Sequence, residues 1–224
     1  MKNIINKIYH SRFFSGIFHT TVYCLKKELS NCETVLDLGC GSSSPLQYCK
    51  SVKYSVGVET FPPYLEESKK RKIHDESIKK RVEEVDFPEK SFDAVIMVEV
   101  LEHLSEEIGY TLLKNAEKWA KKKVIVSTPN GFMPQRQRDG NPFQKHLSGW
   151  NKRTLEKLGF KCRGLAGFKV LRSEYPDEET EDDFTASIRF RPRLFWFFVA
   201  TLSQLAAYPV PGLAFELFCV KKIK

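Results

Sequence analysis

The feature that most restricts the fold is a short apolar run that ends in a glycine turn. Residues 34–38 read TVLDL, and Gly39, Cys40 and Gly41 follow directly. Apolar and β-branched residues in a run of this length are typical of a buried strand. Glycine lets the backbone turn tightly and approach a ligand where a side chain would collide. The run therefore predicts a strand that leads into a ligand-binding turn.

Short apolar runs and helical patterns then alternate along the chain, after one or two helices expected within residues 4–29. The other helix candidates are residues 44–50, 65–74, 105–121 and 151–158, and the other strand candidates are residues 54–58, 94–98, 124–127, 162–170 and 213–220. This alternation predicts an α/β fold with parallel strands and helices on both faces of the sheet. In such sheets, ligands bind just beyond the carboxyl ends of the strands.

The length of 224 residues suits one α/β domain. We expect a single domain over residues 1–224, with an N-terminal helical segment at 1–30 and an insertion at 172–211 before the last strand. The long polar segment at 129–150 follows a strand, so we expect it to lie over the cleft as a functional loop. The acidic run at 177–183 is interpreted as a solvated loop.

Two acidic residues stand where parallel strands end. Asp37 precedes the glycine turn, where it can accept hydrogen bonds from a ligand ammonium or order the turn itself. Glu59 ends the next strand about twenty residues later, where an acid suits bidentate hydrogen bonding to two ribose hydroxyls. The alternative for Glu59 is a surface residue at a strand end. Together with the glycine turn, the two acids favour a nucleotide-type ligand site, with a plain strand-to-helix turn as the alternative.

Taken in order, VLDLGCG, GVE, SFDAVIMVEVLEHL, STPN and LGF resemble the class I S-adenosylmethionine-dependent methyltransferases, in particular the type 11 group, over residues 34–168. The resemblance implies a Rossmann-like sheet of seven mostly parallel strands, the last antiparallel and formed by residues 213–220. It also implies the cofactor-binding residues, which are Asp37, Gly39, Cys40, Gly41, Glu59, Arg81, Val82, Glu83 and Glu99. Of these, Glu59 would hold the ribose, Arg81–Glu83 would flank the adenine, and Glu99 would lie close to the reacting centre.

The sequence departs from the family pattern in two places. Ser42 and Ser43 follow the glycine turn where the family usually has another glycine or small residue. Arg81 stands where the family usually has an acid that meets the adenine amino group. Backbone groups at Arg81 and Val82, or the side chain of Glu83, could take over this contact.

Glu99, Glu102 and His103 form the pattern E-x-x-E-H, and within a helical turn they would share one face. Two carboxylates and an imidazole can hold Mg²⁺ or a softer divalent ion, which would lower the pKa of an acceptor hydroxyl. The pattern resembles the metal site of ubiquinone-pathway and small-RNA 3′-end O-methyltransferases, with His146 as a further ligand. The alternative is that Glu102 and His103 order the loop beside the cofactor. His103 and His146 are also candidates for catalysis, and His146 could act as a general base.

The charge and one apolar segment bear on the partners. The net charge of +8 comes from dispersed Lys and Arg, which usually decorate solvated helix faces, although an anionic partner is the alternative. Residues 194–207 are shorter than the ~20 apolar residues of a spanning helix. They predict a buried or cleft-covering helix, with an interfacial helix that contacts lipid as the alternative. The six cysteines show no metal-binding spacing and are expected to be reduced core residues of a cytoplasmic protein.

These observations predict an S-adenosylmethionine-dependent methyltransferase that acts on a small-molecule, glycan or lipid-linked acceptor. The alternatives are an RNA 2′-O-methyltransferase with a divalent metal such as Mg²⁺, and a non-catalytic adenosyl-binding scaffold. A nucleic-acid partner is not favoured, because the sequence contains no separate RNA-binding module. Peripheral contact with a membrane remains open.

Overall fold

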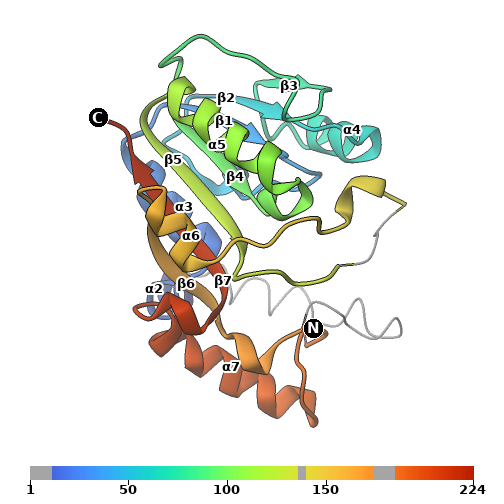
Figure 1. The fold of residues 1–224 in the computed structure, drawn as a ribbon, viewed down its shortest axis with the longest axis vertical. Coiled ribbons are helices and arrows are strands. Elements are labelled where there is room, and N and C mark those ends of the chain that lie inside the picture. Colours follow the sequence, from blue (N-terminus) through green and yellow to red (C-terminus); the bar gives the residue numbers. More distant parts are fainter. Residues whose placement is uncertain (1–11, 136–139, 174–184) are drawn as a thin grey trace.

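The computed structural model describes residues 12–135, 140–173 and 185–224 (Figure 1). These residues form a seven-stranded sheet in the order β3-β2-β1-β4-β5-β7-β6. The strands are β1 Thr34–Leu38, β2 Tyr54–Val58, β3 Glu76–Ile78, β4 Phe92–Val98, β5 Ala120–Pro129, β6 Lys161–Phe168 and β7 Ala214–Lys222. The strands from β3 to β5 pair in parallel, whereas β7 is antiparallel to both of its neighbours. The expected mostly parallel sheet with an antiparallel last strand is therefore confirmed.

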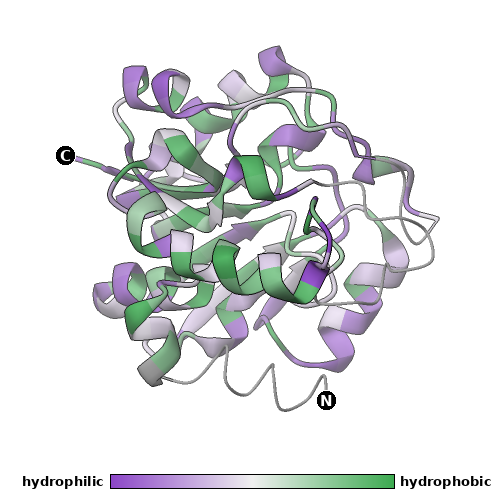
Figure 2. Cartoon of the chain, turned by 90° about the horizontal axis from the view of Figure 1, so that it is seen from below, coloured by the Kyte–Doolittle hydropathy of each residue, from purple (hydrophilic) through white to green (hydrophobic). Residues whose placement is uncertain are grey.

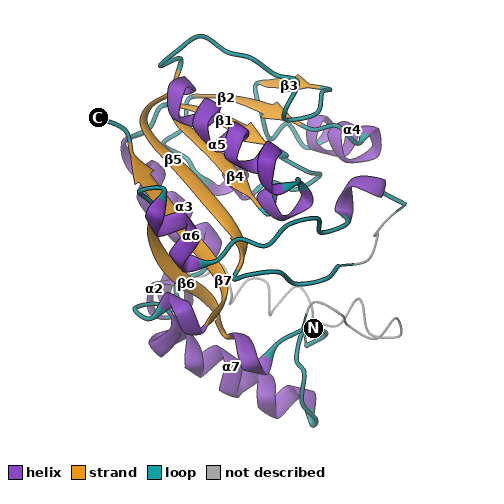
Figure 3. Cartoon of the chain, viewed as in Figure 1, coloured by secondary structure: helices purple, strands orange, loops and turns teal. Residues whose placement is uncertain are grey.

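Helices cover both faces of this sheet (Figure 3). The α-helices are α2 Arg12–Ile17, α3 Thr21–Glu28, α4 Pro62–Lys70, α5 Glu106–Trp119, α6 Lys152–Lys157 and α7 Arg193–Ala207. Short 3₁₀ turns are η1 Leu29–Asn31, η2 Pro45–Tyr48, η3 Leu101–His103, η4 Pro142–Gln144, η5 Lys169–Leu171 and η7 Pro211–Leu213. Ser105 caps α5 by accepting the N–H of Ile108, and the acids of the first turn suit the positive end of the helix.

The two faces of the sheet carry separate cores, because side chains alternate along each strand. Leu36 and Leu38 of β1 point into the core beneath α5, which includes Trp119. Val35, which precedes Leu36 and so faces the other way, points into the core beneath α3, with Leu25. Alternation along a single strand thus explains why both faces need helical cover.

Local sequence signals placed most elements but missed two details. The helix expected at residues 44–50 is only the 3₁₀ turn η2, which Ser44 caps by accepting the N–H of Leu46. Pro45 suits the first turn, and the turn ends at Tyr48. Strand β3 was not predicted, because its short edge sequence, ESI, has no apolar run.

Helix α7 packs one face against β6 and leaves the other face exposed (Figure 2). The helix lies directly on the strand: a side chain at Gly164 would come within 2.2 Å of the Ala207 carbonyl oxygen. Ala200, Gln204 and Ala207 form the buried face of the helix. The expectation of a buried helix therefore holds for one face only. No helix among the described residues is both long and apolar enough to cross a membrane.

The cysteine expectation is partly wrong. A disulfide joins Cys162 of β6 to Cys219 of β7, which face each other across the antiparallel pair. Residues far apart in sequence come together only through strand pairing, so spacing along the chain gave no sign of this bond. The four remaining cysteines, Cys24, Cys32, Cys40 and Cys49, are free and buried. The acidic run at 177–183 lies outside the described residues.

Candidate active site

The glycine turn has the backbone that its sequence predicts. Gly39 and Gly41 have φ angles of 66° and 58°, a region that favours glycine. A side chain at Gly39 would come within 2.7 Å of the Val100 side chain. Between them, the N–H of Cys40 donates to the carbonyl oxygen of Val58 and ties the turn to β2. The turn is therefore tightly packed and held in place at the carboxyl end of the sheet.

Asp37 is buried at the end of β1 and orders the turn. Its Oδ2 accepts a hydrogen bond from the Ser44 hydroxyl and lies 2.9 Å from His74 Nε2. His74 is itself fully buried behind β2. Sequence reasoning missed His74, because nothing in the charged segment around it marks an inward-facing imidazole. Of the two roles expected for Asp37, ordering of the turn is the one visible in these contacts.

Glu59 lies beside the glycine turn at the end of β2. Its carboxylate accepts the N–H of Gly41 at 3.0 Å and the N–H of Phe61 at 2.7 Å. Burial raises the pKa of Glu59, and these backbone hydrogen bonds oppose that effect. Each carboxylate oxygen has a second lone pair. Glu59 thus links the turn after β1 to the segment after β2, the two places where an adenosyl group would lie.

The segment after β3 meets the long polar loop. Arg81 Nε donates to Glu83 at 2.6 Å, and the Arg81 guanidinium lies 5.6 Å from the ring centre of Phe143. Val82, which lies between Arg81 and Glu83 in the sequence, is buried. Phe143 belongs to η4 within the polar loop, so the loop reaches across the carboxyl ends of the strands, as expected from its position in the sequence.

Glu99 follows β4 and belongs to a second group of acids. Its backbone has a φ angle of 56°, and its Oε1 accepts from the Ser127 hydroxyl at 3.0 Å. The same hydroxyl contacts Glu216 of β7, which also accepts from Thr21 at 3.1 Å. Because a hydroxyl carries one proton, one of the two carboxyl groups must supply the other hydrogen bond. Burial raises the pKa of Glu216, and the hydrogen bonds from Ser127 and Thr21 oppose that effect.

Sequence reasoning missed Glu216. The available signal was a single acid within the apolar strand sequence AFELFCV. A lone acid in a buried strand calls for a polar partner or a function.

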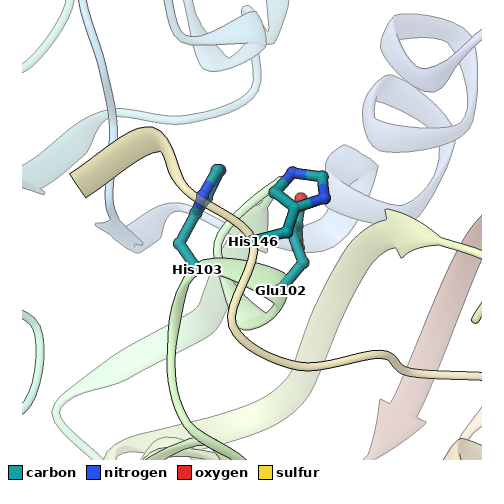
Figure 4. A group of neighbouring side chains, drawn as sticks. All are labelled: Glu102, His103 and His146. Carbon is teal, nitrogen blue, oxygen red and sulfur yellow. The ribbon is translucent and has the colours of Figure 1, made fainter. Parts of the chain in front are cut away.

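Glu102, His103 and His146 meet beside this group, with one ligand atom from each lying within 4.8 Å of the others (Figure 4). Glu102 and His103 come from η3, and His146 comes from the polar loop, which the backbone carbonyl of Glu102 holds by accepting the N–H groups of Leu147 and Ser148. Three of the four predicted metal ligands are therefore together. Glu99 is not part of the group, because it precedes the 3₁₀ turn and does not share its face.

The hydrogen bonds of the two histidines define which ring nitrogen each presents. His146 Nδ1 lies 2.6 Å from the Met133 carbonyl oxygen, and His103 Nδ1 lies 3.3 Å from that of Lys145. A carbonyl oxygen only accepts, so each Nδ1 donates, and each neutral ring keeps a lone pair on Nε2. Burial, and next the proximity of the His146 imidazole, lower the pKa of His103 to about 4, so His103 is neutral at physiological pH. Glu102 Oε2 accepts from Thr128 at 2.9 Å.

A cavity of about 600 Å³ is separated from His146 by Met133, which lines it. Met133, whose carbonyl oxygen accepts from His146, forms part of its wall together with Phe168 and Leu213. Lys169, Arg172 and Arg189 also line it. The cavity therefore combines apolar walls with cationic side chains.

Residues 36–127 match the family described as methyltransferase domain. A methyltransferase from Archaeoglobus fulgidus described as S-adenosylmethionine-dependent is 19% identical with a TM-score of 0.54, covering 94% of this chain and 98% of that one. The methyltransferase domain of a bacterial protein, CtHen1-C, is also 19% identical, with a TM-score of 0.52 and coverage of 90% and 96%. The plantazolicin methyltransferase BpumL, solved with S-adenosylhomocysteine (SAH), is 14% identical, with a TM-score of 0.52 and coverage of 100% and 88%.

At these identities the solved structures establish the fold. No functionally curated protein is similar enough in sequence to count as a relative. The family match contains the glycine turn, Glu59 and η3, the segments on which the resemblance was based. The matched segment is thus a methyltransferase domain, and the chain around it has the fold of class I S-adenosylmethionine-dependent methyltransferases.

Proposed function

We propose that this methyltransferase methylates a hydroxyl oxygen of an amphiphilic small-molecule or lipid-linked acceptor, next to a divalent cation held by Glu102, His103 and His146. The observation that carries the proposal is the convergence of one ligand atom from each of the three residues within 4.8 Å. Backbone carbonyls accept from Nδ1 of both imidazoles and so fix their tautomer, as the hydrogen-bond partners of histidine ligands do in metal sites. In this proposal His103 and His146 are ligands, and no separate general base is needed.

The cofactor would lie along the carboxyl ends of β1, β2 and β4. Gly39, Cys40 and Gly41 offer a turn without side-chain obstruction, and Glu59 offers carboxylate lone pairs for the ribose. Asp37 would act by holding the turn, Arg81 to Glu83 would border the adenine, and Glu99 would face the methyl group. S-adenosylmethionine supplies a methyl group on a positively charged sulfur, so the protein mainly contributes position and exclusion of water.

The chemistry of the three ligands limits which divalent cation would bind. Mg²⁺ prefers oxygen ligands, whereas imidazole suits the transition ions. One carboxylate with two imidazoles therefore favours an ion such as Mn²⁺, Fe²⁺ or Zn²⁺ over the Mg²⁺ that the sequence pattern suggested. When bound, such an ion lowers the pKa of a coordinated hydroxyl, which makes the oxygen a better nucleophile at neutral pH.

The cavity lined by Met133 supports an amphiphilic acceptor. Phe168 and Leu213 offer apolar contact, while Lys169 and Arg189 can pair with an anionic group of the acceptor. An RNA acceptor is less well supported, because the exposed residues around the cavity include the apolar Phe132 and Val170.

We also propose that residues 1–224 form one domain, with the N-terminal helices and α7 covering the same sheet.

The first test is calorimetric titration of the metal-stripped full chain with Mn²⁺, Zn²⁺ and Mg²⁺. We expect transition ions to bind more tightly than Mg²⁺, and Glu102→Gln or His146→Asn to weaken binding by about tenfold or more. Glu99→Gln is the matched control, because Glu99 lies outside the group and should leave metal affinity unchanged. Equal heats of binding in the His146 variant and the natural chain would rule out the metal site.

A further inference from the structure

The outer face of α7 is unusual for a helix on the surface of a protein. Five large apolar side chains along it, those of Leu194, Phe195, Phe198, Leu202 and Leu205, are between 53 and 61% exposed. Residues 195, 198, 202 and 205 follow the spacing of one helical face. We call these five residues the α7 stripe. A contiguous apolar surface of this kind marks a binding interface.

The opposite face of α7 packs closely on β6, so the α7 stripe is not the side of the helix that belongs to the core. Gly164 and Gly167 of β6 let the helix backbone approach the strand, and side chains there would meet the carbonyl oxygens of Ala207 and Ala200 at 2.2 Å. Gln204 is buried and accepts the N–H of Gly167 at 2.8 Å. The inner face is therefore fixed by packing and hydrogen bonds, which leaves the α7 stripe exposed.

Every charged side chain in the segment 185–215, which contains the α7 stripe, is basic. Arg189, Arg191 and Arg193 stand at the amino end of α7, and the sequence from Thr185 to Phe215 contains no Asp or Glu. Aromatic side chains, Phe195 and Trp196 among them, lie at the same end and contact each other. Arginines and aromatics beside an apolar helical face are the signature of a helix that lies in a membrane interface.

We propose that the α7 stripe docks on the surface of a bilayer that contains anionic phospholipids, with the helix lying in the plane of the headgroups. Arg189 lines the same cavity as Met133, and Leu213, also at its edge, is about half exposed. Docking therefore brings the mouth of the cavity to the lipid surface, where an amphiphilic acceptor would enter. Binding to the bilayer in this way requires neither the metal group nor the cofactor.

A second copy of the chain fits the same surface less well. Two copies related by a two-fold axis would bury their apolar stripes together, but each arginine end would meet no carboxylate on the partner's 185–215 segment. An anionic bilayer would bury the α7 stripe and also pair its anionic headgroups with the arginines.

The test is flotation of the purified full chain with vesicles of phosphatidylcholine, with and without phosphatidylglycerol. We expect flotation with the anionic vesicles and a blue shift in the emission of Trp196, since Trp119 and Trp150 are buried. Phe198→Glu and Leu202→Glu should each weaken binding by about tenfold or more. Arg189→Glu should weaken binding by about fivefold or more to anionic vesicles.

Tyr54→Glu is the matched control, because Tyr54 is a partly exposed residue at the far end of the sheet and should leave flotation unchanged. Thermal denaturation of each variant checks that it is folded. Absence of flotation, or equal flotation of Leu202→Glu and the control, would overturn the proposal. So would a dimer, seen by light scattering, that Phe198→Glu dissociates while no vesicle binding is detected.

Discussion

Gly109 in α5 offers a test of how the polar loop is held in place, because two effects of its replacement by alanine oppose each other. Alanine favours a helix over glycine by about 0.8–1.0 kcal/mol. However, a side chain at Gly109 would lie 2.4 Å from the Trp150 ring, where ordinary contact requires at least 3.4 Å. The ring would have to retreat by about an ångström, a shift that packing makes costly.

Trp150 has little freedom to move. It is buried, and its Nε1 donates to the Leu101 carbonyl oxygen at 3.1 Å and to Ser148 Oγ at 2.9 Å. Overpacking costs about 1–3 kcal/mol, and loss of one hydrogen bond adds about 0.5–1.5 kcal/mol. After the gain in helix propensity, the free energy of unfolding should fall by about 1–3 kcal/mol. For a chain of this length, that lowers Tm by about 2–12 °C.

The assay is denaturant unfolding, together with the thermal midpoint, of Gly109→Ala and of the matched control Gly16→Ala. Gly16 lies in α2, and a side chain there meets no atom within 4 Å, so only the helix propensity applies. We expect the control to be unchanged or slightly stabilised. If Gly109→Ala were as stable as the control, Trp150 would not be wedged against α5, and the account of the loop that carries His146 would fail.

Three further changes test the cofactor site, a buried acid and a loop anchor. Glu59→Ala should weaken S-adenosylmethionine binding by at least about tenfold, since two ribose hydrogen bonds to a charged group are lost; unchanged affinity in calorimetry would remove the ribose role. Because burial raises the pKa of Glu216, its contribution to stability is complete below about pH 4.5 and is lost as pH rises through the higher folded pKa. The stability of the natural chain relative to Glu216→Gln, from denaturation at several pH values, should therefore fall above pH 4.5, and a flat or rising difference would refute this. Asn130→Ala should cost about 1–3 kcal/mol, because the Asn130 amide donates to three carbonyl oxygens of the segment before β7; a loss below about 0.5 kcal/mol in denaturant unfolding would contradict this.

The sequence predicted best where the structural cause is local. The apolar run before Gly39 reads as a strand because burial on both faces needs continuous apolar residues. The glycines at 39 and 41 report directly on backbone angles, which the structure reproduces. Glu59 was placed at the end of β2 because strand length and turn spacing are set within one strand–helix–strand unit.

The candidate metal group was half predictable. Glu102 and His103 are neighbours in sequence, so any short turn brings their side chains near each other. His146 was a reasonable guess from its loop, but its arrival within 4.8 Å depends on the loop being held by the Glu102 carbonyl. Glu99 was wrongly grouped with them, because a residue with a φ angle of 56° turns the chain before the 3₁₀ turn begins.

The sequence by itself determined where most strands and helices follow one another along the chain, the glycine turn and the acids at the strand ends. Periodicity, glycine and capping act over only a few residues. Only the tertiary structure decided which distant residues meet. It joined Cys162 to Cys219, placed Glu216 against Ser127, and laid α7 on β6 with its apolar stripe outward. These contacts follow from the position of β7 between β5 and β6, and strand order is set by the packing of the whole sheet.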